Sequence, residues 1–150
     1  QFKLRSGAVS DLYCDVRKLF GDPKLLFAIS RAICKMLPKG TTCVAGSGYG
    51  GLPFAAAVAL IGKTKLSAVR NETKNHGIKK AIEGFVPGMK DKIVIVDDLF
   101  TTGGSILDTA KELKNKGAKI IGAIVVINRS KIRSFQIPLQ HLFTIEEIIN

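Results

Sequence analysis

Two adjacent carboxylates at the end of an apolar run are the strongest chemical feature of the sequence. Asp97 and Asp98 follow the β-branched run at residues 93–96. After them come Leu99, Phe100, Thr101, Thr102, Gly103, Gly104 and Ser105. Glycines let a backbone close around a phosphate, and hydroxyl and N–H groups add donors. Because carboxylates would repel a bare phosphate, they must face hydroxyl groups or a metal ion that the ligand carries. A phosphorylated sugar meets both conditions.

Two other interpretations of the acidic pair are available. Asp97 and Asp98 could simply end a strand and cap the next helix, or they could form the acidic end of a Walker B strand in an ATPase. The ATPase reading requires a GxxxxGK[ST] loop, and the chain contains no such match. The phosphorylated sugar and the plain strand end therefore remain.

A second glycine-rich turn lies at residues 46–51, where the sequence formally matches GxGxxG, and Glu72 stands near the distance expected for a ribose-binding acid. Such a turn can serve tight packing, a dinucleotide or a pyrophosphate, since each requires close backbone approach. The acidic pair favours pyrophosphate, with the backbone amides around Tyr49 and Gly50 as candidate donors.

Three potentially cationic side chains follow in the polar segment 70–77, namely Arg70, Lys74 and His76. Taken alone, a basic segment is usually a solvated surface. Next to a pyrophosphate site it can do more, because negative charge grows on the leaving oxygens as their bond to a sugar breaks. Cations that close over those oxygens stabilise the transition state more than the ground state.

Strands alternating with helices must position these groups. Helical spacing predicts helices at 23–37, 52–61 and 105–116, with Asp22 as an N-cap and Pro23 in the first turn. Apolar runs predict strands at 42–45, 66–70, 92–96 and 120–127, and residues 71–80 are predicted to form a mobile loop. The pattern indicates an α/β fold with a mostly parallel twisted sheet flanked by helices, which binds ligands at the carboxyl ends of its strands.

Composition sets the broad class of the protein. The 150 residues, without a linker or repeat, predict a single domain spanning 1–150. No apolar stretch approaches the roughly 20 residues of a membrane span, and no signal-peptide core opens the chain, so we expect a cytoplasmic protein with no membrane partner. Cys14, Cys34 and Cys43 are expected to be reduced packing residues. The net charge of +11 attracts polyanions, either nucleic acid or a phosphorylated substrate.

Residues 93–105 resemble the signature of type I phosphoribosyltransferases, which bind 5-phosphoribosyl 1-pyrophosphate (PRPP) with Mg²⁺. By this resemblance Asp97 and Asp98 hold the ribose hydroxyls, and residues 101–105 hold the 5-phosphate. The implied PRPP contacts also include Leu99, Phe100, Tyr49, Gly50, Arg70, Lys74 and His76. Mg²⁺ would be held chiefly by PRPP itself, near the two aspartates.

Two further segments resemble the orotate branch of that family. Residues 2–15 look like its FxLxSGxxSxxY segment, here placed in a small N-terminal hood at 1–20, and residues 70–84 look like its catalytic loop. The resemblance implies transfer of the phosphoribosyl group to orotate in pyrimidine synthesis, by a homodimer whose loop 71–80 reaches the partner's site. Implied catalytic residues are Lys74, His76 and Asp98; implied orotate contacts are Arg5, Tyr13, Thr101 and Arg129.

The sequence departs from the branch at several positions. Asn71 stands where a second basic residue is common, Arg5 where a lysine is usual, and Gly50 where some members carry lysine; the usual N-terminal helix does not precede Phe2. These departures keep a phosphoribosyltransferase for another nucleobase as an alternative. A PRPP-sensing, nucleic-acid-binding regulator with the same fold is a second alternative. It is disfavoured because the sequence has no recognition-helix signature and no basic stripe interleaved with aromatics.

Overall fold

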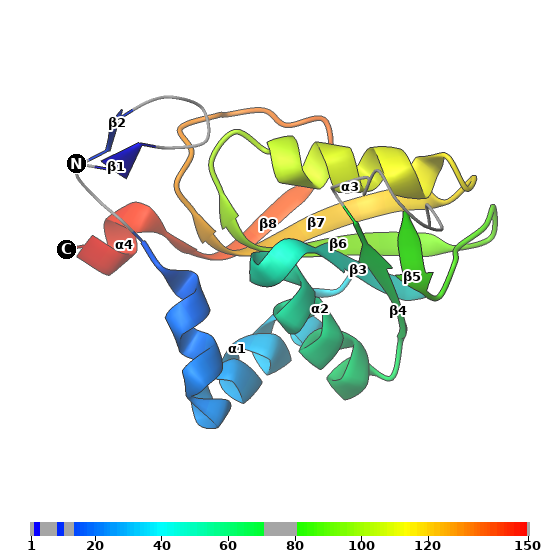
Figure 1. Cartoon of the computed structure of the whole chain (residues 1–150), viewed down its shortest axis with the longest axis horizontal. Helices are drawn as coiled ribbons and strands as arrows, with labels where there is room; N and C mark the ends of the chain where they lie inside the picture. Colours follow the sequence, from blue (N-terminus) through cyan, green and yellow to red (C-terminus); the bar gives the residue numbers. More distant parts are fainter. Residues whose placement is uncertain (1, 4–8, 11–13, 71–80, 150) are drawn as a thin grey trace, which may run out of the picture.

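The computed structural model describes residues 2–3, 9–10, 14–70 and 81–149. A six-stranded sheet has the order β5-β4-β3-β6-β7-β8 (Figure 1). Its strands are β3 (Cys43–Ser47), β4 (Lys65–Val69), β5 (Ile82–Gly84), β6 (Lys92–Phe100), β7 (Lys119–Asn128) and β8 (Leu139–Thr144). All neighbouring pairs are parallel except β4 with β5. Separately, β1 (Phe2–Lys3) pairs antiparallel with β2 (Val9–Ser10). The predicted fold class, a mostly parallel sheet flanked by helices, is confirmed.

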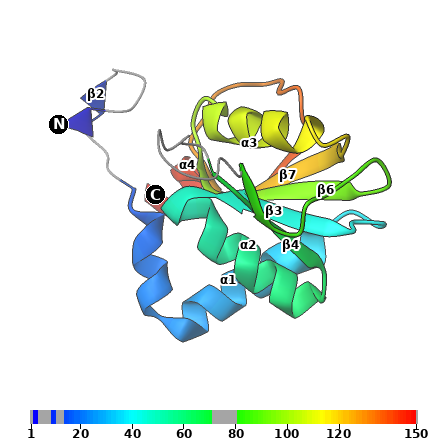
Figure 2. The same cartoon turned by 45° about the vertical axis from the view of Figure 1, so that its right-hand side comes forward.

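Helices cover both faces of the sheet (Figures 1 and 2). The helices are η1 (Val16–Gly21, a 3-10 helix), α1 (Pro23–Met36), α2 (Gly48–Gly62), α3 (Gly104–Lys114) and α4 (Ile145–Ile149). Helices α1 and α2 lie on one face and α3 lies on the other. No helix among the described residues is long and apolar enough to cross a bilayer.

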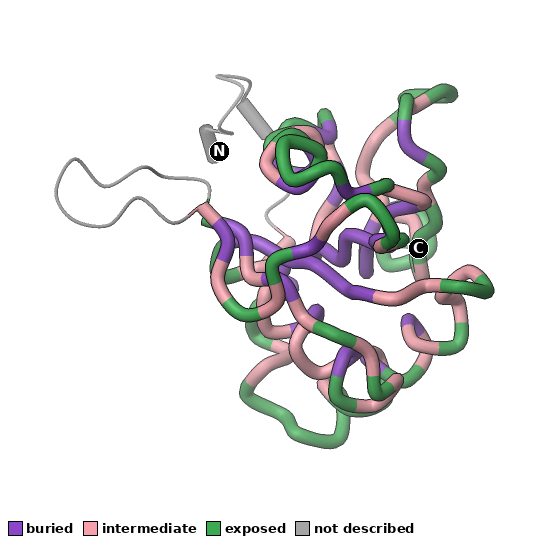
Figure 3. Tube along the Cα trace, turned by 90° about the vertical axis from the view of Figure 1, so that its right-hand side faces the viewer, coloured by how far each residue is buried: buried purple, intermediate pink, exposed green. Residues whose placement is uncertain are grey.

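The core consists of two layers separated by the sheet. Val94 and Val96 of β6 belong to the cluster under α1 and α2, whereas Ile93 and Ile95 belong to the cluster under α3. This alternation follows from the two-residue period of a strand and explains why β6 is apolar on both faces. Buried residues accordingly run along the strands, while the turns are exposed (Figure 3).

The start and end of α1 are as the sequence predicts. The Asp22 carboxylate accepts hydrogen bonds from the backbone N–H groups of Lys24 (2.9 Å) and Leu25 (3.2 Å), and Pro23 occupies the first turn. The helix ends at Met36, and Leu37 is its C-cap, because the residue before Pro38 is disfavoured in the α region.

Two predicted boundaries near the acidic pair were wrong. The turn expected at 46–51 is largely helical, since α2 begins at Gly48 rather than at residue 52. The strand expected to stop at residue 96 continues to Phe100, so both aspartates lie within β6 and not after it. The glycines at 46–51 suggested that the helix begins later, and the two charged aspartates suggested that the strand ends earlier. In both places tertiary packing extends the helix or strand beyond what local composition predicts.

Candidate active site

The acidic pair lies where the strand order of the sheet reverses. Strand β3 leads through α2 to β4 on one side, and its other neighbour β6 leads through α3 to β7 on the opposite side. In open α/β sheets ligands bind at such a reversal, outside the carboxyl ends of the two central strands, and we call this region the crevice. Ser47 ends β3, and Asp97 and Asp98 stand near the end of β6. The acidic pair and Ser47 therefore lie toward the carboxyl ends of two adjacent strands, where the sequence predicted the site.

The first turn of α2 approaches the aspartates very closely. A Cβ atom added to Gly50 would lie 2.5 Å from the Cγ and both carboxylate oxygens of Asp98. A Cβ added to Gly51 would lie 2.8 Å from the carbonyl oxygen of Val96 and 2.9 Å from Oδ1 of Asp97. The short contacts of Gly51 include backbone atoms and exclude a side chain, so Gly51 serves tight packing of helix against strand, whereas at Gly50 it is the Asp98 side chain that would have to move. The packing role that the sequence left open thus applies to Gly51.

Burial gives Asp97 unusual protonation chemistry. Its side chain is only 7% exposed, and this burial, together with the negative charge of Asp98, raises the pKa of Asp97 to about 7. A hydrogen bond from the Ser105 hydroxyl opposes the increase in pKa. The carboxylate Oδ1 of Asp97 also accepts the backbone N–H of Asp98 at 2.9 Å. Asp97 is therefore held in one orientation between β6 and the start of α3.

Asp98 is oriented in a similar way but is less buried. Its Oδ1 accepts the backbone N–H of Leu99 at 2.9 Å, and its side chain is in the intermediate range of exposure. The two neighbouring carboxylates thus differ: Asp97 is enclosed and takes up a proton more readily than an ordinary carboxylate, while Asp98 is more open to a ligand. This pair can offer both a donor and an acceptor to the hydroxyl groups of a sugar.

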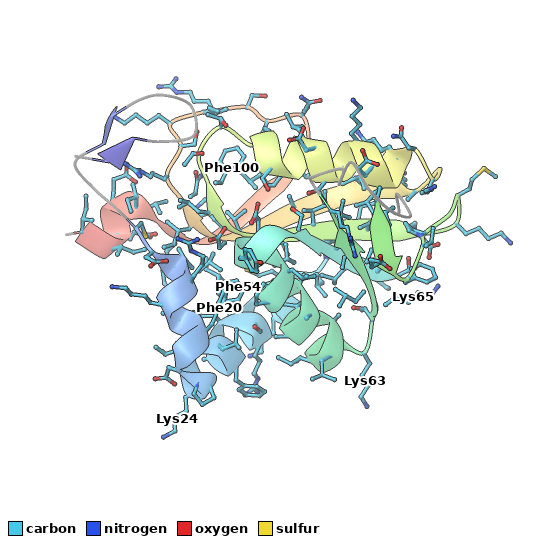
Figure 4. All side chains as sticks on the ribbon, in the orientation of Figure 1. Phe20, Lys24, Phe54, Lys63, Lys65 and Phe100 are labelled. Atoms are coloured by element: carbon cyan, nitrogen blue, oxygen red, sulfur yellow. The ribbon has the colours of Figure 1, made fainter. Side chains whose placement is uncertain are left out.

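The turn after β6 is held from beneath by aromatic rings. Gly103 has a positive φ of 82°, and a Cβ there would lie 2.4 Å from Phe135 and 2.8 Å from Phe100. The two rings meet edge to face with centroids 4.9 Å apart. Phe100 is buried on the α3 side of the sheet, opposite Phe54 and Phe20, as Figure 4 shows. Because of this support the turn can keep a fixed shape without a bound ligand.

The predicted phosphate ligands divide into exposed and buried groups. Thr102, Gly104 and Ser105 are exposed at the start of α3, and Thr101 is half-buried. The side chains of Leu99 and Phe100 pack into the two core clusters instead. Any ligand contact from Leu99 or Phe100 would therefore use the backbone, and the carbonyl of Phe100 already accepts the N–H of Arg129 at 2.9 Å.

Three other predicted residues lie at the rim of this crevice or beside it. Tyr49, in the first turn of α2, is 89% exposed. The Arg70 guanidinium, immediately after β4, forms an ion pair with Glu83 at 3.1 Å. Arg129 immediately follows β7. The remaining predicted residues, Arg5, Tyr13, Lys74 and His76, lie outside the described residues, as does the whole of the predicted loop 71–80, Asn71 included.

The structure adds Cys14 to the surroundings of the site. Burial raises the pKa of its thiol; the nearby Arg129 guanidinium lowers this pKa and the Asp98 carboxylate raises it. The sequence predicted a packing residue, and all three cysteines are indeed free thiols. Its position near both Asp98 and Arg129 depends on the path of the chain before η1, which apolar patterning does not specify.

A buried pair of hydroxyl groups joins the two halves of the crevice. Thr109 on α3 donates to the hydroxyl of Ser47, at the end of β3, over 2.9 Å, and both side chains are buried. The helical pattern could have indicated Thr109, because a polar residue on the apolar face of a helix needs a partner. The sequence reasoning did not identify it.

Comparison with known proteins gives consistent matches. Residues 22–137 match the family described as "Phosphoribosyl transferase domain". The orotate phosphoribosyltransferase of Pyrococcus furiosus is 42% identical over 133 residues, which cover 87% of this chain and 72% of that protein. The enzyme of the same name from Sulfolobus acidocaldarius is 35% identical over 155 aligned positions, covering 99% and 78%. The crystal structure of orotate phosphoribosyltransferase from Aeropyrum pernix superimposes with a TM-score of 0.81 at 30% identity, covering 99% of this chain and 87% of that one.

Proposed function

The chain belongs to the phosphoribosyl transferase domain family, and from that premise we propose that it transfers the 5-phosphoribosyl group of PRPP to orotate. The products are orotidine 5′-monophosphate and pyrophosphate. The observation that carries the proposal is the acidic pair beside the glycine- and hydroxyl-rich turn, at the point where the strand order reverses. Relatives of 33–42% identity that carry the orotate enzyme's name support the choice of orotate.

The described residues suit the separate parts of PRPP. The 5-phosphate fits the N-terminal turn of α3, where Thr102 and Ser105 are exposed and backbone N–H groups are free of intrahelical partners. The ribose hydroxyls then face Asp97 and Asp98. The pyrophosphate lies toward the first turn of α2, where the backbone around Tyr49 and Gly50 can donate. Of these groups, the two carboxylates are already oriented by hydrogen bonds from backbone N–H groups.

The reaction exchanges one bond at C1′ for another. The bond from C1′ to the pyrophosphate oxygen breaks, N1 of orotate forms the new bond from the opposite face, and N1 gives up its proton. Lys74 and His76 stabilise the negative charge that grows on the leaving oxygens, and Asp98 orients the ribose. Arg129 binds the orotate carboxylate, which a guanidinium can do through two hydrogen bonds. Arg5, Tyr13 and Thr101 complete the contacts to orotate.

Mg²⁺ fits this site as a companion of the substrate. A hard cation prefers oxygen ligands, and Asp98 offers a partly exposed carboxylate, whereas the raised pKa of Asp97 makes that group a weaker ligand. Within the described ranges no group of three or more His, Cys, Asp or Glu side chains could hold a metal by itself. When bound, Mg²⁺ supplies charge neutralisation to the pyrophosphate.

The direct test follows the ultraviolet absorbance of orotate, which falls when orotidine 5′-monophosphate forms. We expect the fall to require both PRPP and Mg²⁺, and Lys74→Ala to lower kcat by roughly 10² to 10³. Competition with uracil and with purines tests the alternative of another nucleobase. Turnover with one of those bases and none with orotate would overturn the choice of substrate.

The quaternary arrangement is part of the same proposal. We expect a cytoplasmic homodimer in which the loop 71–80 of one subunit serves the site of its partner. Mixing inactive Lys74→Ala protein with inactive Asp98→Asn protein should then restore up to about a quarter of the activity, since random pairing creates one intact site in half of the dimers. Light scattering measures the oligomer directly. A monomer, or a mixture that stays inactive after subunit exchange, would contradict shared sites.

A further inference from the structure

The end of the sheet opposite the crevice carries an accumulation of positive charge. Strands β3, β4, β6 and β7 are parallel, so they all begin at this amino edge. Exposed lysines stand at the strand starts, at the ends of α2 and α3, or in the turns between them. We call these residues the lysine edge: Lys39, Lys63, Lys65, Lys90, Lys92, Lys114, Lys116 and Lys119. Figure 4 shows two of them, Lys63 and Lys65, on the side of the molecule away from Lys24.

Several contacts bring members of the lysine edge close to one another. Lys92 and Lys119 are register neighbours on adjacent strands β6 and β7. A Cβ atom added to Gly40 would lie 3.7 Å from Nζ of Lys92, so that ammonium group lies over the turn that holds Lys39. A Cβ on Gly117 would lie 3.0 Å from Met89, which brings the turns of Lys90 and Lys116 together.

The carboxylate among these lysines is engaged in structure. Asp91 accepts hydrogen bonds from the Thr42 hydroxyl at 3.1 Å and the Gly88 N–H at 3.0 Å, and it pairs with Lys65 at 3.4 Å. These hydrogen bonds lower the pKa of Asp91. Lys65 also lies 4.0 Å from the centre of the Phe85 ring. The other lysines of the edge form no ion pair with any described residue.

Positive charge without partners is unfavourable for folding. Like charges on paired strands are destabilising, and Lys92 and Lys119 form such a pair. A helix C-terminus stabilises a nearby cation, which accounts for Lys114 at the end of α3, but the strand starts have no such compensation. The edge therefore presents a surface whose repulsion a bound polyanion would relieve.

The chemistry of the edge favours a phosphate backbone over a protein surface. Protein interfaces are depleted in lysine and enriched in arginine and aromatic residues. Lysine also binds phosphate, as a point charge without the geometric selectivity of a guanidinium, which suits a backbone contact that reads no sequence. The edge contains no arginine, and its aromatic ring, Phe85, is covered by Lys65 instead of being free to stack on a base. Single strands are usually held by such stacking, so the geometry favours a duplex.

We propose that the lysine edge binds the phosphate backbone of a nucleic-acid duplex without reading its sequence. The crevice and the edge occupy opposite ends of the same strands, so a duplex and PRPP can be bound together. This inference does not rest on the proposed transferase activity. It differs from the expectation drawn from sequence, in which the basic residues were assigned partly to the pyrophosphate.

Fluorescence anisotropy with a labelled duplex of about 20 base pairs tests the proposal, between about 50 and 200 mM salt. The edge variant carries Lys90→Gln, Lys92→Gln, Lys116→Gln and Lys119→Gln. The matched control carries Lys18→Gln, Lys24→Gln, Lys131→Gln and Arg133→Gln, which remove the same charge elsewhere. The slope of log K against log salt is negative, and each lost phosphate contact reduces its magnitude by about 0.9. We therefore expect the magnitude of the slope to fall by about 3 to 4 in the edge variant, and the affinity to fall at least about tenfold.

The control must keep the affinity and salt slope of the original protein for the proposal to stand. Equal losses in the two variants would show that net charge alone attracts the duplex, and would overturn the proposal. Absence of duplex binding by the unmodified protein would overturn it too. So would displacement of the duplex by poly-glutamate at equal charge concentration, which would indicate an acidic protein as the partner. Urea unfolding of both variants provides a check of folding that does not depend on the proposed activity.

Discussion

Each end of the sheet places two like-charged side chains next to each other, but the pair at the carboxyl end, here the carboxyl edge, is largely enclosed and the pair at the amino edge is exposed. At the carboxyl edge, Asp97 and Asp98 are adjacent, and backbone N–H groups fix one oxygen of each at 2.9 Å. At the amino edge, Lys92 and Lys119 are neighbours and remain exposed, with no ion pair to another described residue. Burial and the neighbouring Asp98 charge raise the pKa of Asp97, whereas the two exposed lysines are separated only by water and salt.

This difference explains what each edge can recognise. Buried, oriented groups in a low-dielectric setting interact strongly with a ligand of one shape. Exposed ammonium groups on flexible side chains interact more weakly, and their interactions are screened by salt. The carboxyl edge is therefore suited to one small molecule, and the amino edge to an extended polyanion of any sequence.

The first prediction concerns the proton on Asp97. Because its pKa in the folded state, about 7, exceeds the ordinary value of 3.8, the folded protein binds the additional proton between these pH values. The contribution of this group to stability is complete below about pH 4 and is lost as the pH rises through 7, by up to about 4 kcal/mol. Urea unfolding at several pH values should show this loss in the original protein and not in Asp97→Asn. Parallel profiles for the two proteins would contradict the assignment.

The second prediction separates Asp98 from its neighbour. Asp98→Asn keeps the size of the side chain but removes the charge that faces the ligand, so kcat/KM for PRPP should fall by roughly 10² to 10³. Asp108→Asn, on the exposed side of α3, is the matched control and should leave kcat/KM unchanged. A value of kcat/KM for Asp98→Asn within about threefold of the control would remove Asp98 from the ribose site.

Much of this arrangement could be predicted from the sequence. The alternation of strand and helix patterns predicted the sheet and its helices. The acidic pair beside a hydroxyl-rich turn predicted where the site lies. Both predictions depend on local patterns, which tertiary packing reinforces. The short antiparallel strand β5 was not predicted, since three residues carry too little pattern. The neighbourhood of Cys14, and the hydrogen bond between Thr109 and Ser47, depend on contacts between distant segments, which periodicity does not encode.

The distribution of lysines was the least predictable feature. In sequence they are scattered from Lys39 to Lys119, and only the parallel sheet brings their strand starts to one edge. Arg70, Lys74 and His76 were assigned a role from the sequence because these three lie close together in one polar segment. Net charge alone therefore could not indicate where the positive charge gathers, and the fold was needed to place the lysines at one end of the sheet.

The third prediction tests how tightly the carboxyl edge is packed. Gly51→Ala would place a methyl group 2.8 Å from the carbonyl oxygen of Val96, and backbone on both sides limits any adjustment. We expect a loss of about 1–3 kcal/mol in the free energy of unfolding. Gly21→Ala, with no atom within 4 Å of the added Cβ, is the control and should change stability little. Equal stability of the two variants in urea would mean that α2 can move away from the aspartates.

The fourth and smallest effect concerns repulsion at the amino edge. Lys119→Glu would replace a like-charge neighbour of Lys92 by an opposite charge, so the free energy of unfolding should rise by about 0.2–1 kcal/mol at low salt. The gain should largely disappear in about 1 M salt, where the screening length is about 3 Å. Lys131→Glu, in an exposed segment outside the sheet, is the control. If Lys119→Glu is more stable and also binds duplex less well, then the lysine pair lowers folding stability but favours binding, as expected of a binding surface. If stability does not change, the exposed ammonium groups already avoid one another, and the charge of the edge carries no cost that a ligand could relieve.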